Sequence, residues 1–264
     1  MTGEPVVDRA FRLLGCFRTG DTALSLTSLS TRSGIPKATS LRLLRRLVEV
    51  GAVEQLADGT YVLGLRLLEL ASLAPRGHGL RLAALPHMQA LHAAYGQHVL
   101  LAVRDGHTSV LVERLSAHEA GKLMYRVGGR MPLHATGVGL VLLAHVDDAT
   151  REEVLSQPLL LEPEGMQVTA AAVRRRLELV RRGGIAVMAR KQPEPLVSLA
   201  APVYRHGEVV AAVSVLADEG SLTSPKLEAS VRMTAAAISR AVTAREEQHD
   251  RGERSFAWEP PTSP

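Results

Sequence analysis

The stretch from Leu24 to Gly51 constrains the fold of this chain more than any other segment. Its apolar residues form two runs with the three-to-four spacing of helices that bury one face. We expect Thr27 to cap the start of the first helix and Gly34 to end it, because glycine adopts the left-handed conformation at low cost. Pro36, with its fixed φ, suits the start of the second helix. The pattern predicts a helix-turn-helix.

The charge of this stretch favours DNA as its partner. No acidic residue occurs between Asp21 and Glu49, whereas basic residues are frequent. Such a surface attracts phosphates through counterion release, and hydroxyls at a helix N-terminus add donors where the helix dipole is also favourable. A solvated basic face without a partner is the alternative. The candidate DNA-binding residues are Arg32, Lys37, Thr39, Ser40, Arg42, Arg45 and Arg46.

A β-hairpin is expected directly after the second helix. The run from Ala52 to Gly64 alternates apolar and polar residues around Asp58-Gly59, a strong hairpin signal. A hairpin in this place makes the module a winged helix-turn-helix. Its apolar anchors are expected to be Val53, Leu56, Tyr61 and Leu63.

The remaining sequence predicts a linker and a larger α+β domain. Strand and helix patterns follow each other from His98, and about six strands with helices on at least one side are expected. We expect Pro75–Gly79 to break a linker helix and Pro86 to kink the next helix. The expected strands are 98–106, 109–115, 122–128, 185–190, 197–204 and 208–217, and the expected helices are 6–17, 65–73, 80–95, 134–145, 147–156, 169–182 and 224–247. The expected domains are a DNA-binding domain at 1–64, a linker helix at 65–79, a second domain at 80–248 and a disordered tail at 249–264.

Composition sets further limits on function. The 264 residues carry a net charge of +4, which permits nucleic acid as a partner without proving it. Aromatic residues make up only 3%, which argues against single-stranded nucleic acid bound by base stacking. The single cysteine, Cys16, excludes an internal disulfide framework and is expected to be buried. Without a signal-peptide pattern or a long apolar run, we expect a cytoplasmic protein with no membrane partner.

No set of residues with catalytic spacing is found, and we expect neither a metal nor a cofactor. His87 and His92 are five residues apart, off the spacing that lets one helix face hold a metal. No glycine-rich phosphate loop occurs. Two hypotheses remain: a ligand-responsive transcriptional regulator, and a small-molecule hydrolase or transferase with an accessory DNA-binding module.

Several segments, taken in order, resemble the IclR family of bacterial transcriptional regulators up to about residue 245. They are LSTRSGIPKATSLRLLRRL at 29–47, DGTYVLG at 58–64, GGRMPLHATGVG at 128–139, AAPV at 200–203 and AAVSV at 211–215. The resemblance implies a winged helix-turn-helix, a linker helix and a C-terminal effector-binding domain with a GAF-like mixed sheet. It also implies homodimers or homotetramers on double-stranded operator DNA, with a small-molecule effector that changes DNA binding.

The resemblance also implies an effector pocket. Pro132–Gly137 matches the stretch in which backbone amides and a helix N-terminus line the pocket, and Ser198 and Ser214 match further pocket positions. Glycines in this stretch could instead serve close helix packing. Met188 and Leu216 stand where the family carries an acid and a second serine, which implies a larger or more apolar effector, or a domain that only dimerises. The candidate effector-binding residues are His134, Ala135, Thr136, Gly137, Met188, Ser198, Ser214 and Leu216, and Arg190 and Lys191 could meet an anionic group.

Overall fold

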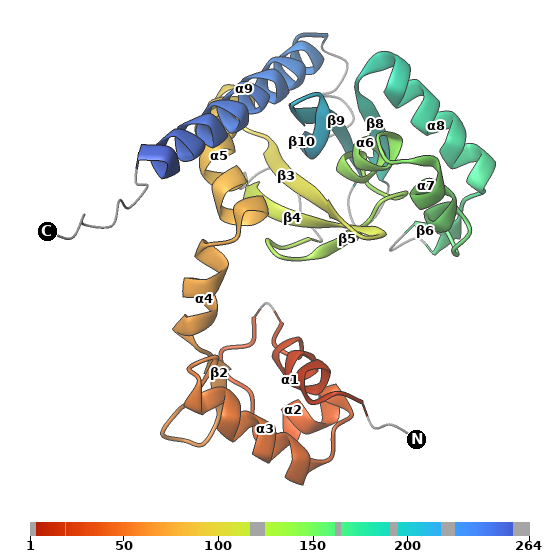
Figure 1. Ribbon diagram of the computed structural model, residues 1–264. Coiled ribbons are helices and arrows are strands. Elements are labelled where there is room, and N and C mark those ends of the chain that lie inside the picture. The colour runs from red at the N-terminus through yellow and green to blue at the C-terminus, as the bar shows by residue number, and fades with distance from the viewer. Residues whose placement is uncertain are drawn as a thin grey trace, which may run out of the picture. The chain divides into compact units, whose positions relative to one another are not determined.

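The computed structural model describes residues 4–18, 20–116, 125–161, 165–190, 195–217 and 225–255 (Figure 1). They form two compact units, Met1–His78 and Gly79–Pro264. The expected α+β class is confirmed, since a small helical unit with a hairpin precedes a larger unit built on a sheet. Among the residues described, no helix combines the length and apolarity that a membrane crossing requires.

The first unit is a helix-turn-helix with a short wing. Its elements are α1 (Val6–Leu14), α2 (Leu26–Ser33), α3 (Lys37–Glu49), β1 (Val53–Gln55), β2 (Tyr61–Leu63) and α4 (Leu65–Ser72). Leu13, Leu29 and Leu44 are fully buried at the centre of its core. A backbone bridge between Leu24 and Tyr61 joins the segment before α2 to the wing.

The turn between α2 and α3 forms where the sequence predicted, but α2 begins at a different residue. Gly34 ends α2 with φ 66°, and Pro36 directly precedes α3, as expected. The cap of α2 is Ser25 rather than Thr27, so the expected cap was wrong. The backbone of Ser25 is extended, and its Oγ accepts a hydrogen bond from the Ser28 amide at 3.1 Å. Helix α2 therefore begins earlier than the sequence suggested.

The wing is anchored by fewer residues than expected. Val53 and Tyr61 are buried, whereas Leu56 and Leu63 are 42% and 48% exposed, so these two are not anchors. The two strands have only three residues each, and Leu56 lies beyond the end of β1. The core of this small unit therefore covers little more than the base of the hairpin.

The second unit is built on a sheet with the strand order β5-β4-β3-β10-β9-β8. Within the described ranges, every neighbouring pair in it is antiparallel. The strands are β3 (His98–Asp105), β4 (Thr108–Leu115), β5 (Arg130–Pro132), β8 (Ala186–Arg190), β9 (Leu196–Arg205) and β10 (Glu208–Ala217), and β6 (Leu160–Leu161) pairs with β7 (Met166–Gln167) in a separate hairpin.

Helices cover both faces of this sheet, so it separates two apolar cores. One core packs α5 (Leu80–Tyr95) and α9 (Pro225–Ser255) against the sheet, and these two helices lie side by side in Figure 1. The other core packs α6 (Gly137–Ala144) and α8 (Ala170–Gly183) against the opposite face, with α7 (Asp148–Leu155) beside them. The long apolar runs of β3, β9 and β10 reflect burial on both faces.

Several boundaries in the second unit differ from expectation. Of the strand expected at 122–128, residues 122–124 lie outside the described ranges, and 125–128 is a turn that leads to β5. The helix expected from His134 begins only at Gly137, because Thr136 caps it. Pro75–Gly79 is a π-helical segment that runs directly into α5, not a break.

The C-terminal helix is longer than the sequence suggested. Helix α9 continues to Ser255, so the disorder expected from residue 249 is wrong as far as that residue. The rest of the expected tail, 256–264, lies outside the described residues.

Candidate functional site

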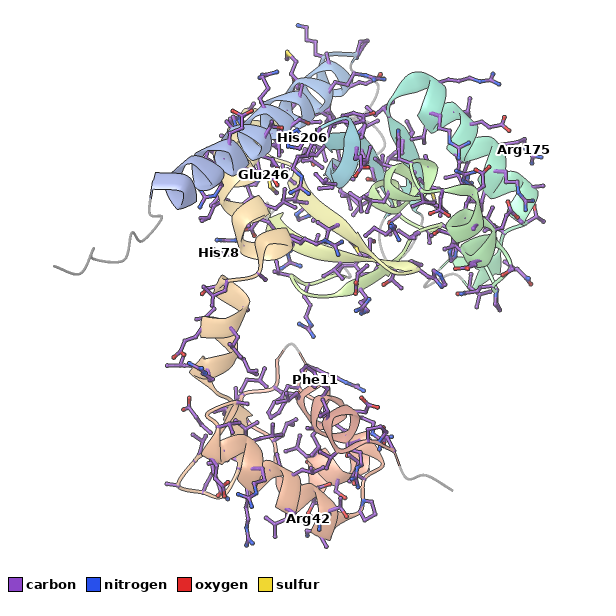
Figure 2. The ribbon with its side chains drawn as sticks, viewed as in Figure 1. Phe11, Arg42, His78, Arg175, His206 and Glu246 are labelled. Atoms are coloured by element: carbon purple, nitrogen blue, oxygen red, sulfur yellow. The ribbon has the colours of Figure 1, made fainter. Side chains whose placement is uncertain are left out.

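The exposed face of α3 carries several cations, and among the described residues only Arg46 of this face forms an ion pair. Lys37, Arg42 and Arg45 are exposed, and Thr39 is half-buried beside them. Arg42 projects from α3 away from α1 (Figure 2). Arg46 is also exposed but pairs with Glu49 at 2.6 Å, a contact that costs little to break in water. This face presents mobile positive charge beside a helix N-terminus, where phosphate oxygens find both charge and free amides.

Two of the expected DNA-binding residues do not belong to this face. Ser40 is fully buried and donates its hydroxyl to the Ile35 carbonyl at 3.1 Å, so it stabilises the turn and cannot reach a phosphate. Arg32 binds both carboxylate oxygens of Asp21, at 2.6 and 3.1 Å, and the Cys16 carbonyl at 3.0 Å. The hydrogen bond from Arg32, followed by that from the Arg18 amide, lowers the pKa of Asp21. The charge of Arg32 is therefore already neutralised within the fold.

The second unit contains a cavity of about 240 Å³ between α6, α8 and one face of the sheet. Seven of the eight expected effector residues line it: Ala135, Thr136, Gly137, Met188, Ser198, Ser214 and Leu216. His134 does not, because its ring is buried and its Nε2 lies 2.9 Å from the Leu160 carbonyl, so that expectation is corrected. Leucine and methionine side chains form most of the remaining wall, namely Leu100, Met131, Leu161, Met166 and Leu196.

The start of α6 packs directly onto β9 and shapes one wall of the cavity. A Cβ on Gly137 would lie 2.4 Å from the Ser198 hydroxyl oxygen and 3.0 Å from the Ser198 Cβ, so a larger residue there would force the Ser198 side chain to move. Thr136 accepts a hydrogen bond from the Gly139 amide at 3.0 Å and donates to the Pro132 carbonyl at 3.2 Å. Gly137 thus serves both close packing and the cavity wall, two roles that the sequence left as alternatives.

The cavity wall also contains the polar side chains of Ser214, Arg176 and Tyr125. Ser214 is fully buried, and its hydroxyl has no hydrogen-bond partner among the described residues. Arg176 and Tyr125 were not expected from the sequence. Arg176 comes from α8, and its Nη1 lies 3.5 Å from the Met188 sulfur. A signal for it existed, since it follows buried Val173 by three residues and therefore lies toward the buried face of the helix.

A chain of polar contacts leads from the cavity wall to the start of α5. The Arg114 guanidinium donates to the Tyr125 carbonyl at 2.8 Å, and the Arg114 amide donates to Glu113 Oε1 at 2.7 Å. Glu113 Oε2 in turn accepts from Arg81 Nε at 2.5 Å. Glu113 is buried, and Arg81 is the second residue of α5, just after the π-helical segment. Arg190 and Lys191, also considered for this cavity, lie outside the described side chains.

Comparison with known proteins assigns both units. Residues 6–57 match the IclR helix-turn-helix domain, and residues 74–240 match the bacterial transcriptional regulator IclR C-terminal domain. The chain is 32% identical over 242 residues to the glycerol operon regulatory protein of Streptomyces griseus, covering 89% of this chain and 94% of that protein. It is 29% identical over 220 residues to the HTH-type transcriptional regulator XynR of Escherichia coli (strain K12), covering 79% and 84%.

A solved structure agrees with the fold over most of the chain. It is an IclR homolog from Microbacterium hydrocarbonoxydans in complex with 4-hydroxybenzoate, 33% identical, with a TM-score of 0.83 and coverage of 91% of this chain and 100% of that one. These relatives are regulators, so the enzyme hypothesis is set aside, and the protein is a DNA-binding regulator with an effector-binding C-terminal domain. The chain belongs to the IclR family of bacterial transcriptional regulators.

Proposed function

We propose that this regulator reads duplex DNA with the exposed face of α3 and that occupancy of the cavity in the second unit changes its affinity for that DNA. The observation that carries the proposal is the exposed positive charge of Lys37, Arg42 and Arg45 on α3, which forms no ion pair with any residue that the structure describes. Helices presented in this way enter the major groove and contact phosphates on either side. Thr39 and Arg46 extend the same face, whereas Ser40 and Arg32 do not contribute.

The volume and the lining of the cavity favour a small organic effector with one apolar ring. Its volume of about 240 Å³ lies just below the ~300–1,000 Å³ of typical ligand sites, which favours a single ring over a nucleotide. Its wall is mostly aliphatic and thioether, and such walls bind flat apolar bodies well. The Microbacterium homolog, crystallised with 4-hydroxybenzoate, supports a ligand of this size.

A homodimer, or a tetramer built from dimers, fits the surface of the first unit. Phe11 on α1 and Leu65, Leu68 and Leu73 on or beside α4 are each more than 60% exposed in the single chain. Apolar groups gathered on helices of a soluble unit favour a protein partner. A second copy is the natural partner, because a two-fold axis brings two recognition helices to two half-sites of one operator. We place this assembly in the cytoplasm, where it meets its operator.

The decisive experiment measures how DNA retention depends on salt for the variant Arg42→Ala/Arg45→Ala. Each lost phosphate contact removes about 0.9 from the slope of log affinity against log salt, so a dimer should lose up to about 3.6. The probe is the DNA adjoining the gene of this protein, with random DNA of equal length for comparison. Arg175→Ala/Arg182→Ala, on exposed positions of α8, removes the same charge elsewhere and should leave the slope unchanged. Equal slopes for both double variants would contradict the assignment of α3.

A further inference from the structure

Arg176 holds a charge that the described part of the protein leaves without an anion. Its neighbour Arg174 binds Glu152 in a salt bridge, and Arg175 points into solvent (Figure 2). Arg176 is instead half-buried at the cavity wall, where its guanidinium lies 3.5 Å from the Met188 sulfur. A guanidinium has five donors and a thioether is a weak acceptor. A carboxylate in the cavity would satisfy this group far better than the described residues around it do.

The charge of the cavity wall has one sign among the described residues. Apart from Arg176 and the phenol of Tyr125, the wall consists of apolar side chains, hydroxyls and backbone. No described carboxylate lines the cavity to balance Arg176. An aliphatic wall has a low local dielectric, which strengthens the attraction to an anion and penalises a cation. The wall therefore selects a ligand with one negative group.

A second polar anchor lies on a different element from the first. Arg176 comes from α8 and packs against Met188, which pairs with Ser198 on β9. Ser214 lies on β10 and pairs with Ala200 of β9. The Arg176 guanidinium and the buried Ser214 hydroxyl both line the cavity. A single ligand in the cavity can therefore be offered two polar contacts from two elements.

We propose, on the basis of the ligand cavity proposed above, that Arg176 and Ser214 hold the two polar groups of the effector. Arg176 binds a carboxylate, and the Ser214 hydroxyl, which has no hydrogen-bond partner among the described residues, binds a hydroxyl of the same ligand. The effector class is therefore the small monocarboxylates that carry an apolar ring and a hydroxyl group. Arg176 is the residue that separates acids from neutral analogues of the same shape, since it is the one charged side chain among the described residues of the wall.

The test compares three ligands by calorimetric titration of the full-length protein. The probes are 4-hydroxybenzoate, its neutral isostere 4-hydroxybenzamide, and benzoate, which lacks the hydroxyl. Wild-type protein should prefer the acid over the amide by at least about tenfold, the value of one charge-assisted hydrogen bond. Arg176→Gln should weaken the acid by about 10–100-fold and the amide by less than about threefold. Ser214→Ala should weaken 4-hydroxybenzoate by about 5–10-fold and leave benzoate nearly unchanged.

Arg175→Gln is the matched control. It removes the neighbouring charge on α8, which faces solvent, and should leave all three affinities unchanged. Equal binding of acid and amide by wild type, with no loss in Arg176→Gln, overturns this inference and leaves the ring-binding cavity in place. Failure of all three probes to bind a protein that still retains DNA overturns the cavity proposal and this inference with it.

Discussion

Gly64 is the position where one added methyl group should separate the two functions of this protein. It lies between β2 and α4 with φ −81°, a conformation open to any residue, so any effect comes from space alone. A Cβ on Gly64 would lie 2.1 Å from the Gly51 carbonyl oxygen and 2.9 Å from its carbon. The obstacle is backbone, which cannot rotate away as a side chain would. The two segments must therefore separate by about 1.3 Å before the Cβ and the carbonyl oxygen, 2.1 Å apart, reach an ordinary contact distance of 3.4 Å.

That separation costs a large share of the stability of a unit of this size. Overpacking of this kind costs about 1–3 kcal/mol. The hydrogen bond from the Gly64 amide to the Ala52 carbonyl, 3.0 Å long, would also be lost, at about 1 kcal/mol. A total of about 2–4 kcal/mol should lower the melting temperature of the first unit by at least about 8 °C. The second unit shares none of these contacts and should melt as in wild type.

Differential scanning calorimetry of full-length Gly64→Ala checks the expectation, since two compact units should give two transitions. Above the lowered first transition, DNA retention should disappear while ligand titration of the second unit is preserved. Gly183→Ala is the control, because a Cβ there meets nothing within 4 Å at the end of α8. A first transition within about 2 °C of wild type, or both transitions falling together, would refute the packing argument.

Three further predictions concern charge and burial. The lowered pKa of Asp21 means that its contact with Arg32 stabilises the first unit at neutral pH and is lost as the carboxylate protonates in acid. Asp21→Asn should therefore melt earlier at pH 7, and the difference should shrink as the pH falls below 3.8, the ordinary value, and through the lowered pKa. Burial raises the pKa of the Cys16 thiol, so a thiol reagent at pH 8 should react slowly with wild type and faster as the first unit unfolds. Glu113→Gln keeps the shape of the side chain but removes its ion pair with Arg81. The affinity for ligand should stay the same, while the effect of ligand on DNA affinity should fall by at least about threefold. An unchanged effect would exclude this contact from the coupling.

The elements with strong local signals were predictable from the sequence. Gly34 and Gly184 end their helices in the left-handed conformation, and Thr169 caps α8 through the Ala172 amide. The turn at His206-Gly207 has positive φ at both residues and joins β9 to β10. These features depend on a few neighbouring residues, so local chemistry decides them.

Site residues that follow from local sequence patterns were predictable, whereas those that depend on tertiary packing were not. Ser40 and Arg32 were expected on the DNA-binding face because both are polar residues of basic helices. Burial against Ile35 and pairing with Asp21 remove them from that face, and neither contact can be read from helical spacing. Arg176 shows the converse, since an arginine in a run of three predicts a solvated surface. Its spacing from Val173 indicates the buried side of α8, but only the packing of α8 against α6 and β8 brings that side to the cavity wall.

The sheet of the second unit is a single layer between the core that contains the cavity and a second core formed with α5 and α9. Ser214 faces the cavity, while Val213 and Val215 on the same strand are buried among α5 and α9. Filled interiors resist compression, so a strand pushed from the ligand side must displace what lies behind it. Side chains that never touch the effector therefore help to set how tightly it is held. Substitutions on the face of β10 that packs against α5 and α9 can change sensitivity to a metabolite while the cavity wall stays chemically the same.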